Sequence, residues 1–97
     1  MQLYMIRRRN GWGSPGELEA AAERSKAVAA DSFPDDIRWI RSYVVQESDG
    51  SLGTFCIYEA SSDDKVREHA REVGMPADDI MPIAETVVVR PDPVAAQ

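Results

Sequence analysis

The sequence predicts an α+β domain in which a four-stranded antiparallel sheet carries two helices on one face. Two observations lead to this fold class. Segments with strand-like composition and segments with helical periodicity follow one another in the order strand, helix, strand, strand, helix, strand. Right-handed crossover connections then place both helices on the same side of the sheet. The 97 residues suffice for one such domain and are too few for two separate cores.

The first strand is expected over residues 2–9, where apolar side chains fall on both faces of the alternating pattern. A turn over residues 10–13 separates it from the first helix. Ser14 as N-cap, Pro15 at the first helical position and Glu17 at the third predict the start of this helix, which should continue to about Ala30. Its inner stripe is made mostly of small side chains, which predicts close packing on the sheet. The stripe comprises Leu18, Ala21, Ala22, Ser25, Val28 and Ala29.

The two central strands are expected over residues 37–46 and 52–60, because both segments are rich in β-branched and aromatic side chains. Asp49 and Gly50 lie between them, and Asp-Gly is a strong hairpin signal. The two strands are therefore predicted to pair directly as an antiparallel hairpin.

A second helix is expected from a cap at Ser61 or Ser62 to Gly74, the residue type that most often ends a helix. The last strand is predicted over residues 83–89, which contain three consecutive valines. With this strand the order becomes βαββαβ. That order, with both helices on one face, is the ferredoxin-like fold.

One domain is expected over residues 1–90, followed by a flexible tail over residues 91–97. The net charge of −6 argues against a nucleic-acid partner. No apolar run reaches the ~20 residues of a membrane span, so no membrane partner is expected. The amino terminus lacks the order of a secretory signal, which predicts a cytoplasmic location. Cys56 is the only cysteine, which excludes an intrachain disulfide and a multi-cysteine zinc site.

The alternation of side chains along the hairpin predicts which of them face the helices. The simplest pairing places Ile40, Val44, Phe55 and Ile57 beneath the helices. The open face of the sheet then carries Trp39, Arg41, Tyr43, Cys56 and Tyr58. So aromatic a patch is unusual on a solvated monomer, which predicts a homodimer interface, a small-molecule pocket, or both. Simple interface packing explains the same residues equally well.

Two residues are candidate metal ligands. His69, the only histidine, lies on an apolar helical stripe with Val66 and Val73, where a histidine is more often a packing residue than a ligand. Glu59 ends the third strand, where a carboxylate either serves as a ligand or general base or is simply solvated. Cys56 sits in mid-strand and is expected to behave as a small hydrophobic residue.

Four short stretches together resemble one family. They are W-x-x-S-Y from Trp39, C-x-Y-E-A from Cys56, R-E-H-A around His69, and G-M-P-A-D over residues 74–78. This pattern resembles a family of small bacterial domains of largely unknown function, typified by an actinobacterial nickel-binding protein. The resemblance implies a ferredoxin-like fold, a homodimer, and nickel binding for at least one member. The family commonly has a histidine two positions after the strand tryptophan, where this chain has Arg41.

Two functional hypotheses follow. The first is a small dimeric metal-binding protein with nickel as its cofactor, held by His69 and Glu59. The alternative is a cofactor-free small-molecule-binding protein or tailoring enzyme of the dimeric α/β barrel type, with its pocket on the open sheet face. The sequence leaves open whether the protein is an enzyme. The pocket residues in this alternative are Trp39, Arg41, Tyr43, Cys56 and Tyr58.

Overall fold

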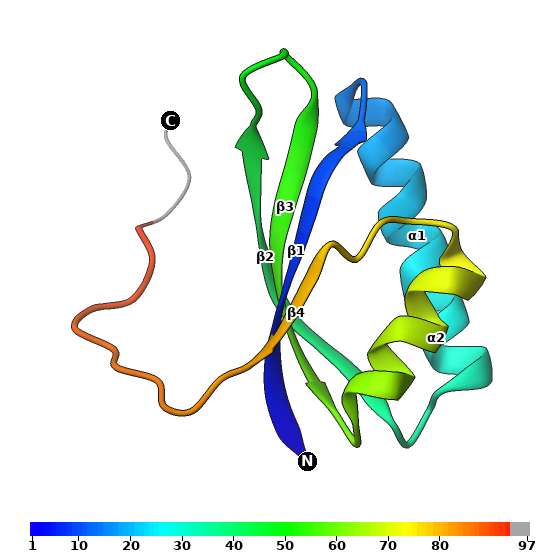
Figure 1. Cartoon of the computed structure of the whole chain (residues 1–97), viewed down its shortest axis with the longest axis vertical. Helices are drawn as coiled ribbons and strands as arrows, with labels where there is room; N and C mark the ends of the chain where they lie inside the picture. Colours follow the sequence, from blue (N-terminus) through cyan, green and yellow to red (C-terminus); the bar gives the residue numbers. More distant parts are fainter. Residues whose placement is uncertain (94–97) are drawn as a thin grey trace.

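The computed structural model describes residues 1–93, and it places two helices on one face of a four-stranded sheet (Figure 1). The elements are β1 (Gln2–Trp12), α1 (Pro15–Ser32), β2 (Ile37–Gln46), β3 (Leu52–Ala60), α2 (Asp63–Val73) and β4 (Asp79–Pro82). The strand order is β2-β3-β1-β4, and each neighbouring pair is antiparallel. The predicted ferredoxin-like fold is thereby confirmed. Neither helix is long and apolar enough to cross a membrane.

The caps of both helices form as the sequence predicts. The Ser14 hydroxyl accepts a hydrogen bond from the backbone N–H of Glu17, at 3.3 Å. Ser62, rather than Ser61, caps α2 by accepting from the backbone N–H of Lys65. Gly74 ends α2 with φ +82°, a left-handed conformation that glycine adopts without steric cost.

The first strand is longer than predicted. Residues 10–12 belong to β1, because the chain resumes its pairing with β3 at Trp12 after an irregular step that begins beyond Arg8. Asn10 takes up this irregularity with φ +50°, which asparagine tolerates better than most residues. As a result, the Trp12 side chain is buried beside α1 and does not lie in a surface turn.

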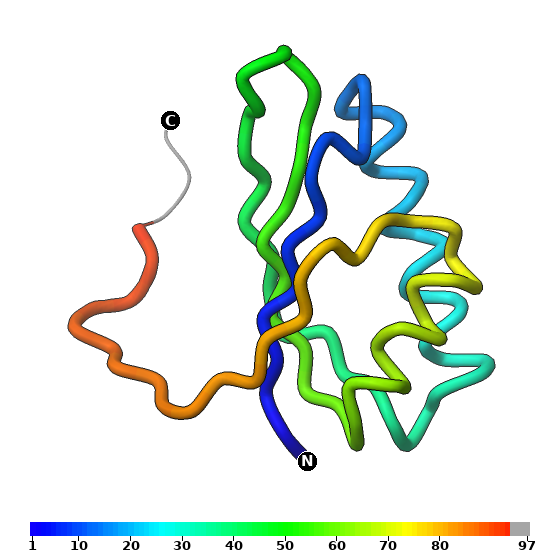
Figure 2. Tube along the Cα trace, viewed as in Figure 1, coloured from blue at the N-terminus to red at the C-terminus, as the bar shows by residue number. Residues whose placement is uncertain are grey.

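The prediction of a last strand over residues 83–89 is wrong. The paired strand is β4, in which Arg7 lies opposite Asp79 and Tyr4 opposite Pro82. The Ile83 N–H still donates to the Leu3 carbonyl. Because the pairing is antiparallel, the residues after Ile83 run past Gln2, where β1 begins, and find no partner groups on β1. The chain leaves the sheet there and arcs along the side away from the helices (Figure 2). The three valines at 87–89 are therefore 71–85% exposed.

The predicted tail begins within this arc. The structure describes it as far as Pro93, and the rest of the expected tail lies outside the described residues. Asp92 accepts hydrogen bonds from the Tyr43 hydroxyl at 2.8 Å and from the Arg41 guanidinium at 3.0 Å.

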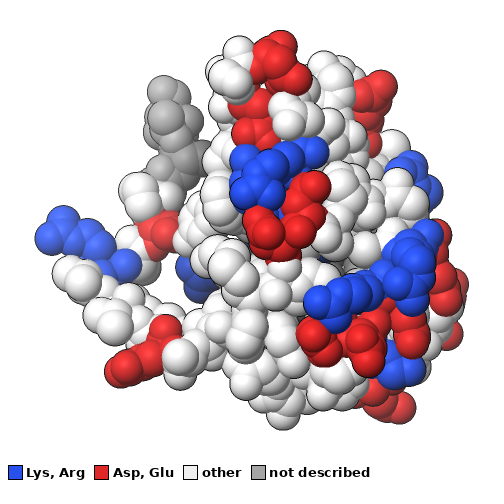
Figure 3. All heavy atoms as spheres, viewed as in Figure 1, with Lys and Arg blue, Asp and Glu red and all other residues white. Residues whose placement is uncertain are grey.

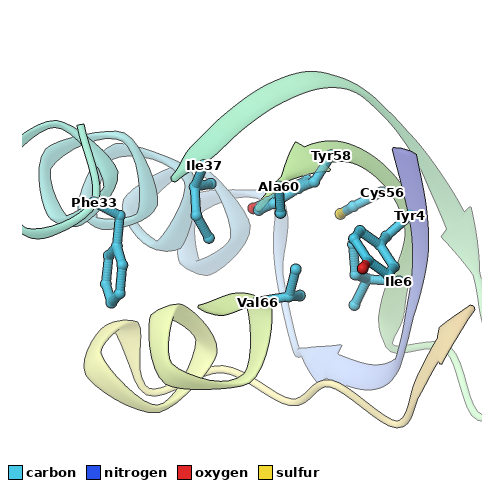
Figure 4. Close-up of a cluster of buried hydrophobic side chains, with 8 residues drawn as sticks. All are labelled: Tyr4, Ile6, Phe33, Ile37, Cys56, Tyr58, Ala60 and Val66. Carbon is cyan, nitrogen blue, oxygen red and sulfur yellow. The ribbon is translucent and has the colours of Figure 1, made fainter. Parts of the chain in front are cut away.

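The predicted assignment of hairpin faces is wrong for β3. Cys56, Tyr58 and Ala60 face the helices and are 0–4% exposed, whereas Phe55 and Ile57 lie on the open face. The pairing with β1 explains this difference. Tyr58 lies opposite Tyr4 and Cys56 lies opposite Ile6, and the side chains of both β1 residues are buried beneath the helices. Figure 4 shows the resulting core. It contains Tyr4, Ile6, Phe33, Ile37, Cys56, Tyr58, Ala60 and Val66.

A β-bulge in β2 splits the predicted patch between the two faces. Trp39 lies opposite Tyr58, but the next paired residue, Arg41, lies opposite Ile57. The extra residue is Ile40, which is 49% exposed, and it interrupts the alternation. Trp39 therefore turns toward the helices, while Arg41 and Tyr43 turn toward the open face. Val44, expected beneath the helices, is 52% exposed because it lies on the edge strand.

Candidate functional site

A cavity of about 530 Å³ lies between α1 and the helix-covered face of the sheet. The small inner stripe of α1 forms one wall, so these side chains leave space instead of closing the helix onto the sheet. Aromatic and small polar side chains from β1, β2 and β3 form the opposite wall. The principal lining residues are Arg8, Trp12, Leu18, Ala21, Ala22, Ser25, Lys26, Trp39, Ser42, Thr54, Cys56 and Tyr58.

Arg8 is the most unusual residue of the cavity wall. Its side chain projects from β1 to the same side as Tyr4 and Ile6, and the residue is only 1% exposed. One guanidinium nitrogen, Nη1, donates to the Pro76 carbonyl at 2.6 Å, and the guanidinium carbon lies 5.6 Å from the centre of the Tyr58 ring. The other terminal nitrogen, Nη2, is buried and has no hydrogen-bond partner within residues 1–93.

A polar cluster borders the inner end of the cavity. The Ser25 hydroxyl lies 3.2 Å from the Tyr58 hydroxyl and 3.4 Å from Nε2 of His69. The same Nε2 lies 3.1 Å from the Ser25 carbonyl, which can only accept, so Nε2 carries the proton. Burial raises the pKa of Tyr58 and lowers the pKa of His69, so both side chains are neutral near pH 7.

This cluster does not form a serine nucleophile with a histidine base. A general base would need a lone pair on the imidazole nitrogen nearest the Ser25 hydroxyl, but that nitrogen, Nε2, donates its proton to the Ser25 carbonyl. The Nδ1 lone pair of His69 is buried and has no hydrogen-bond partner among residues 1–93. The cluster instead holds α1, α2 and β3 together at the end of the cavity.

The structure brings together four of the five residues predicted for a small-molecule pocket. Trp39, Cys56 and Tyr58 line the cavity with side chains on the helix-covered face, not on the open face as predicted. Arg41 borders the cavity next to the β-bulge, although its guanidinium lies on the open face. Tyr43 does not line it. The guanidinium of Arg41 contacts Tyr43 and Asp92, and these contacts raise its pKa further.

The structure does not bring the two predicted metal ligands together. His69 is fully buried between the helices and the sheet, whereas Glu59 alternates with Tyr58 and Ala60 and so lies on the open face. There Glu59 accepts from Arg38 at 3.2 Å. Within residues 1–93 no three histidine, cysteine or carboxylate side chains are gathered as a metal site would require. The donors within the described part of one chain therefore do not form a site that fits a nickel ion.

Sequence reasoning missed Arg8 because arginine is rarely buried without a charged partner. The alternation of side chains along β1 nevertheless indicates that Arg8 is buried, since Arg8 shares its face of the strand with the apolar residues Tyr4 and Ile6. Most other basic side chains are paired at the surface. Figure 3 shows acidic and basic groups close together on the face in view. Arg67 forms one such surface ion pair with Asp63, at 2.8 Å.

One comparison with known proteins identifies the family, and a second supports the fold. A family model described as nickel responsive protein SCO4226-like matches residues 4–83. The crystal structure of SCO4226 from Streptomyces coelicolor A3(2) is similar to this chain with a TM-score of 0.72. The two share 21% sequence identity over 88% of this chain and 99% of that one, a likeness that supports the fold alone. No curated protein matches the sequence. Because the family model spans most of the chain, the protein belongs to the SCO4226-like family of nickel responsive proteins.

Proposed function

We propose that this protein binds a small organic molecule in the cavity between α1 and the sheet. The observation that carries the proposal is the cavity itself, whose volume of about 530 Å³ is in the range of ligand sites. The cavity is open to solvent on one side, where exposed residues such as Pro15, Lys26 and Ile40 line it. Aromatic walls with a few convergent polar groups are typical of such sites.

A cavity-filling substitution tests this function. Ala22 lines the cavity, whereas Ala27 is exposed on the same helix and lines none of the cavities described. Phenylbutanol serves as a neutral probe with an aromatic ring and a short chain. We expect Ala22→Phe to weaken its binding by about ten-fold or more, because the new ring occupies the same space. Ala27→Phe should bind like the wild type.

The measurement is a titration followed by amide and indole resonances in two-dimensional NMR. Binding should shift the indole N–H signals of Trp12 and Trp39, which both line the cavity. No shift in these signals with phenylbutanol at up to about 1 mM, a concentration that detects even weak affinity, would contradict the proposed function.

Nickel binding is a second candidate, favoured by the description of the family as nickel responsive. The surroundings of His69 argue against it as the ligand. Its Nε2 donates to the Ser25 carbonyl, and within residues 1–93 it belongs to no group of three or more histidine, cysteine or carboxylate side chains. We therefore expect the wild type and His69→Gln to have the same affinity for nickel in a calorimetric titration. Stoichiometric binding that disappears in His69→Gln would instead place the metal at α2.

We also propose that the protein forms a homodimer through the open face of the sheet. Phe55 and Ile57 lie on this face only partly buried, and the segment with the exposed valines runs along the same side (Figure 1). Burying such a surface against a second copy would remove apolar area from water. A cytoplasmic location likewise stays a prediction.

Sedimentation equilibrium tests the dimer. The wild type should sediment as a dimer at tens of micromolar, and Val88→Asp should shift it toward the monomer, because Val88 is 71% exposed in the single chain. Glu85→Lys, a charge change on the same segment, should have a smaller effect. A wild-type protein that is monomeric throughout this range would contradict the proposed dimer.

A further inference from the structure

The guanidinium of Arg8 is a buried cation without a counter-charge. Within residues 1–93 it forms no ion pair, and its only hydrogen bond goes to the neutral Pro76 carbonyl at 2.6 Å. The Nη2 nitrogen, although enclosed, donates to no group in the described part of the chain. Buried charges and donors are normally paired, since leaving them unpaired costs several kcal/mol. Arginine stays charged under all ordinary conditions, so protonation cannot relieve this cost.

A second donor stands directly beside Arg8. Thr54 lies opposite Arg8 in the pairing of β1 with β3, is 2% exposed, and lines the same cavity. Its hydroxyl oxygen accepts from the Cys56 thiol at 3.2 Å, which leaves the hydroxyl proton free to donate. Two adjacent strands thus present two uncommitted donors at one place.

The charges around the cavity favour an anion as well. Of the charged residues that line it, Arg8 and Lys26 are basic and only the exposed residue Glu19 is acidic. Arg41 also borders the cavity, but its guanidinium is paired with Asp92 on the open face. This balance is the reverse of that of the whole chain, whose net charge is −6. An excess of positive charge in a concave, partly apolar site raises the local concentration of anions.

We propose that the natural ligand is an amphipathic monocarboxylate. Its carboxylate pairs with Nη2 of Arg8 and with the Thr54 hydroxyl, and its aromatic or aliphatic body packs against Trp12, Trp39 and Tyr58. A single free guanidinium nitrogen beside one hydroxyl suits a carboxylate better than a phosphate, whose additional charged oxygens would remain unpaired in the apolar cavity. This inference rests on the proposed function and names the ligand class for the same site.

Two probes of nearly equal shape test the proposal, each titrated near pH 7. Phenylbutyrate carries the carboxylate, and phenylbutanol replaces it by a hydroxyl. We expect the wild type to bind phenylbutyrate about ten-fold more tightly, because a charge-assisted hydrogen bond is roughly twice as strong as a neutral one. Arg8→Met should abolish this preference, and Arg9→Met, which changes the exposed neighbour of Arg8, should retain it.

The outcomes separate this inference from the function on which it rests. Equal binding of both probes by the wild type would overturn the carboxylate proposal and leave the cavity as a ligand site. Binding of neither probe would overturn both. If Arg8→Met still binds phenylbutyrate more tightly than phenylbutanol, Arg8 is not the residue that pairs with the carboxylate. If Arg8→Met does not fold, Thr54→Val decides in its place, since loss of the hydroxyl should weaken phenylbutyrate binding several-fold and leave phenylbutanol binding unchanged.

Discussion

Replacing Gly53 by alanine is expected to lower the free energy of unfolding by about 2–3 kcal/mol, the cost of overpacking a rigid site. A Cβ at this position would lie 2.7 Å from the Arg8 carbonyl oxygen and 2.8 Å from Nη1 of Arg7, and it would overlap the Glu47 carboxylate. None of these groups can move freely. The Arg7 guanidinium donates to both oxygens of Glu47, at 2.8 and 3.0 Å, and its Nη1 donates to the Arg8 carbonyl.

Urea unfolding of the wild type and Gly53→Ala measures this effect, with Gly16→Ala as the matched control. Gly16 lies in the first turn of α1, and a Cβ there would meet only the Ser14 hydroxyl, at 3.9 Å. The control should be neutral or slightly stabilising, because alanine is a better helix former than glycine. If Gly53→Ala unfolds at the same urea concentration as the wild type, the prediction is wrong, and the strands β1 and β3 move apart enough to admit the methyl group.

The stability of the protein is expected to fall as the pH decreases below about 6.5, by up to about 1.4 kcal/mol per pH unit, because of His69. Burial of the imidazole lowers its pKa in the folded protein, and the nearby Arg8 guanidinium acts in the same direction. Hydrogen bonding to Ser25 and the charge of Glu72 oppose the shift without reversing it. Between the folded and unfolded pKa values the unfolded chain binds the proton more readily, so acid favours unfolding.

Urea unfolding at pH 7.5 and at pH 5.5 measures this dependence. His69→Gln retains an amide N–H that can donate to the Ser25 carbonyl but does not titrate, so its stability should change less over the same interval. The carboxyl groups of Glu47, Asp49 and Asp63 have lowered pKa values and titrate below this interval. Parallel pH profiles for the two proteins would show that His69 does not control the loss of stability.

The order of elements and the helix caps were predictable because they depend on local chemistry. Ser14, Ser62 and Gly74 satisfy backbone groups within a few residues of themselves, so their roles can be inferred from the sequence alone. The position of the last strand depends instead on the register in which it pairs with β1. The three valines favour β-structure, but the short connection after α2 brings the chain to β1 at Asp79. Antiparallel pairing then runs toward Gln2, the first residue of β1, and no residue of β1 lies opposite the valines.

The candidate site was predicted only in part, for a related reason. Alternation correctly groups Trp39, Cys56 and Tyr58, but it does not indicate which face of the sheet the helices cover. Strict alternation through β2 also adds Arg41 and Tyr43 to this group, and the β-bulge separates them from it. The bulge at Ile40 leaves no mark in the amino-acid pattern. The burial of Arg8 also requires the tertiary structure, since only the loop after α2 supplies the Pro76 carbonyl that receives its hydrogen bond.

The three consecutive arginines of β1 connect it to three different parts of the molecule. Arg7 holds Glu47 at the hairpin, Arg8 holds Pro76 in the loop after α2, and Arg9 contacts Asp79 at the start of β4. Since β1 is also central in the sheet, no small fluctuation can free its backbone while the rest stays folded. In deuterated solvent the amide hydrogens from Ile6 to Arg8 should therefore be among the last to exchange, and their exchange should report the opening of the whole domain.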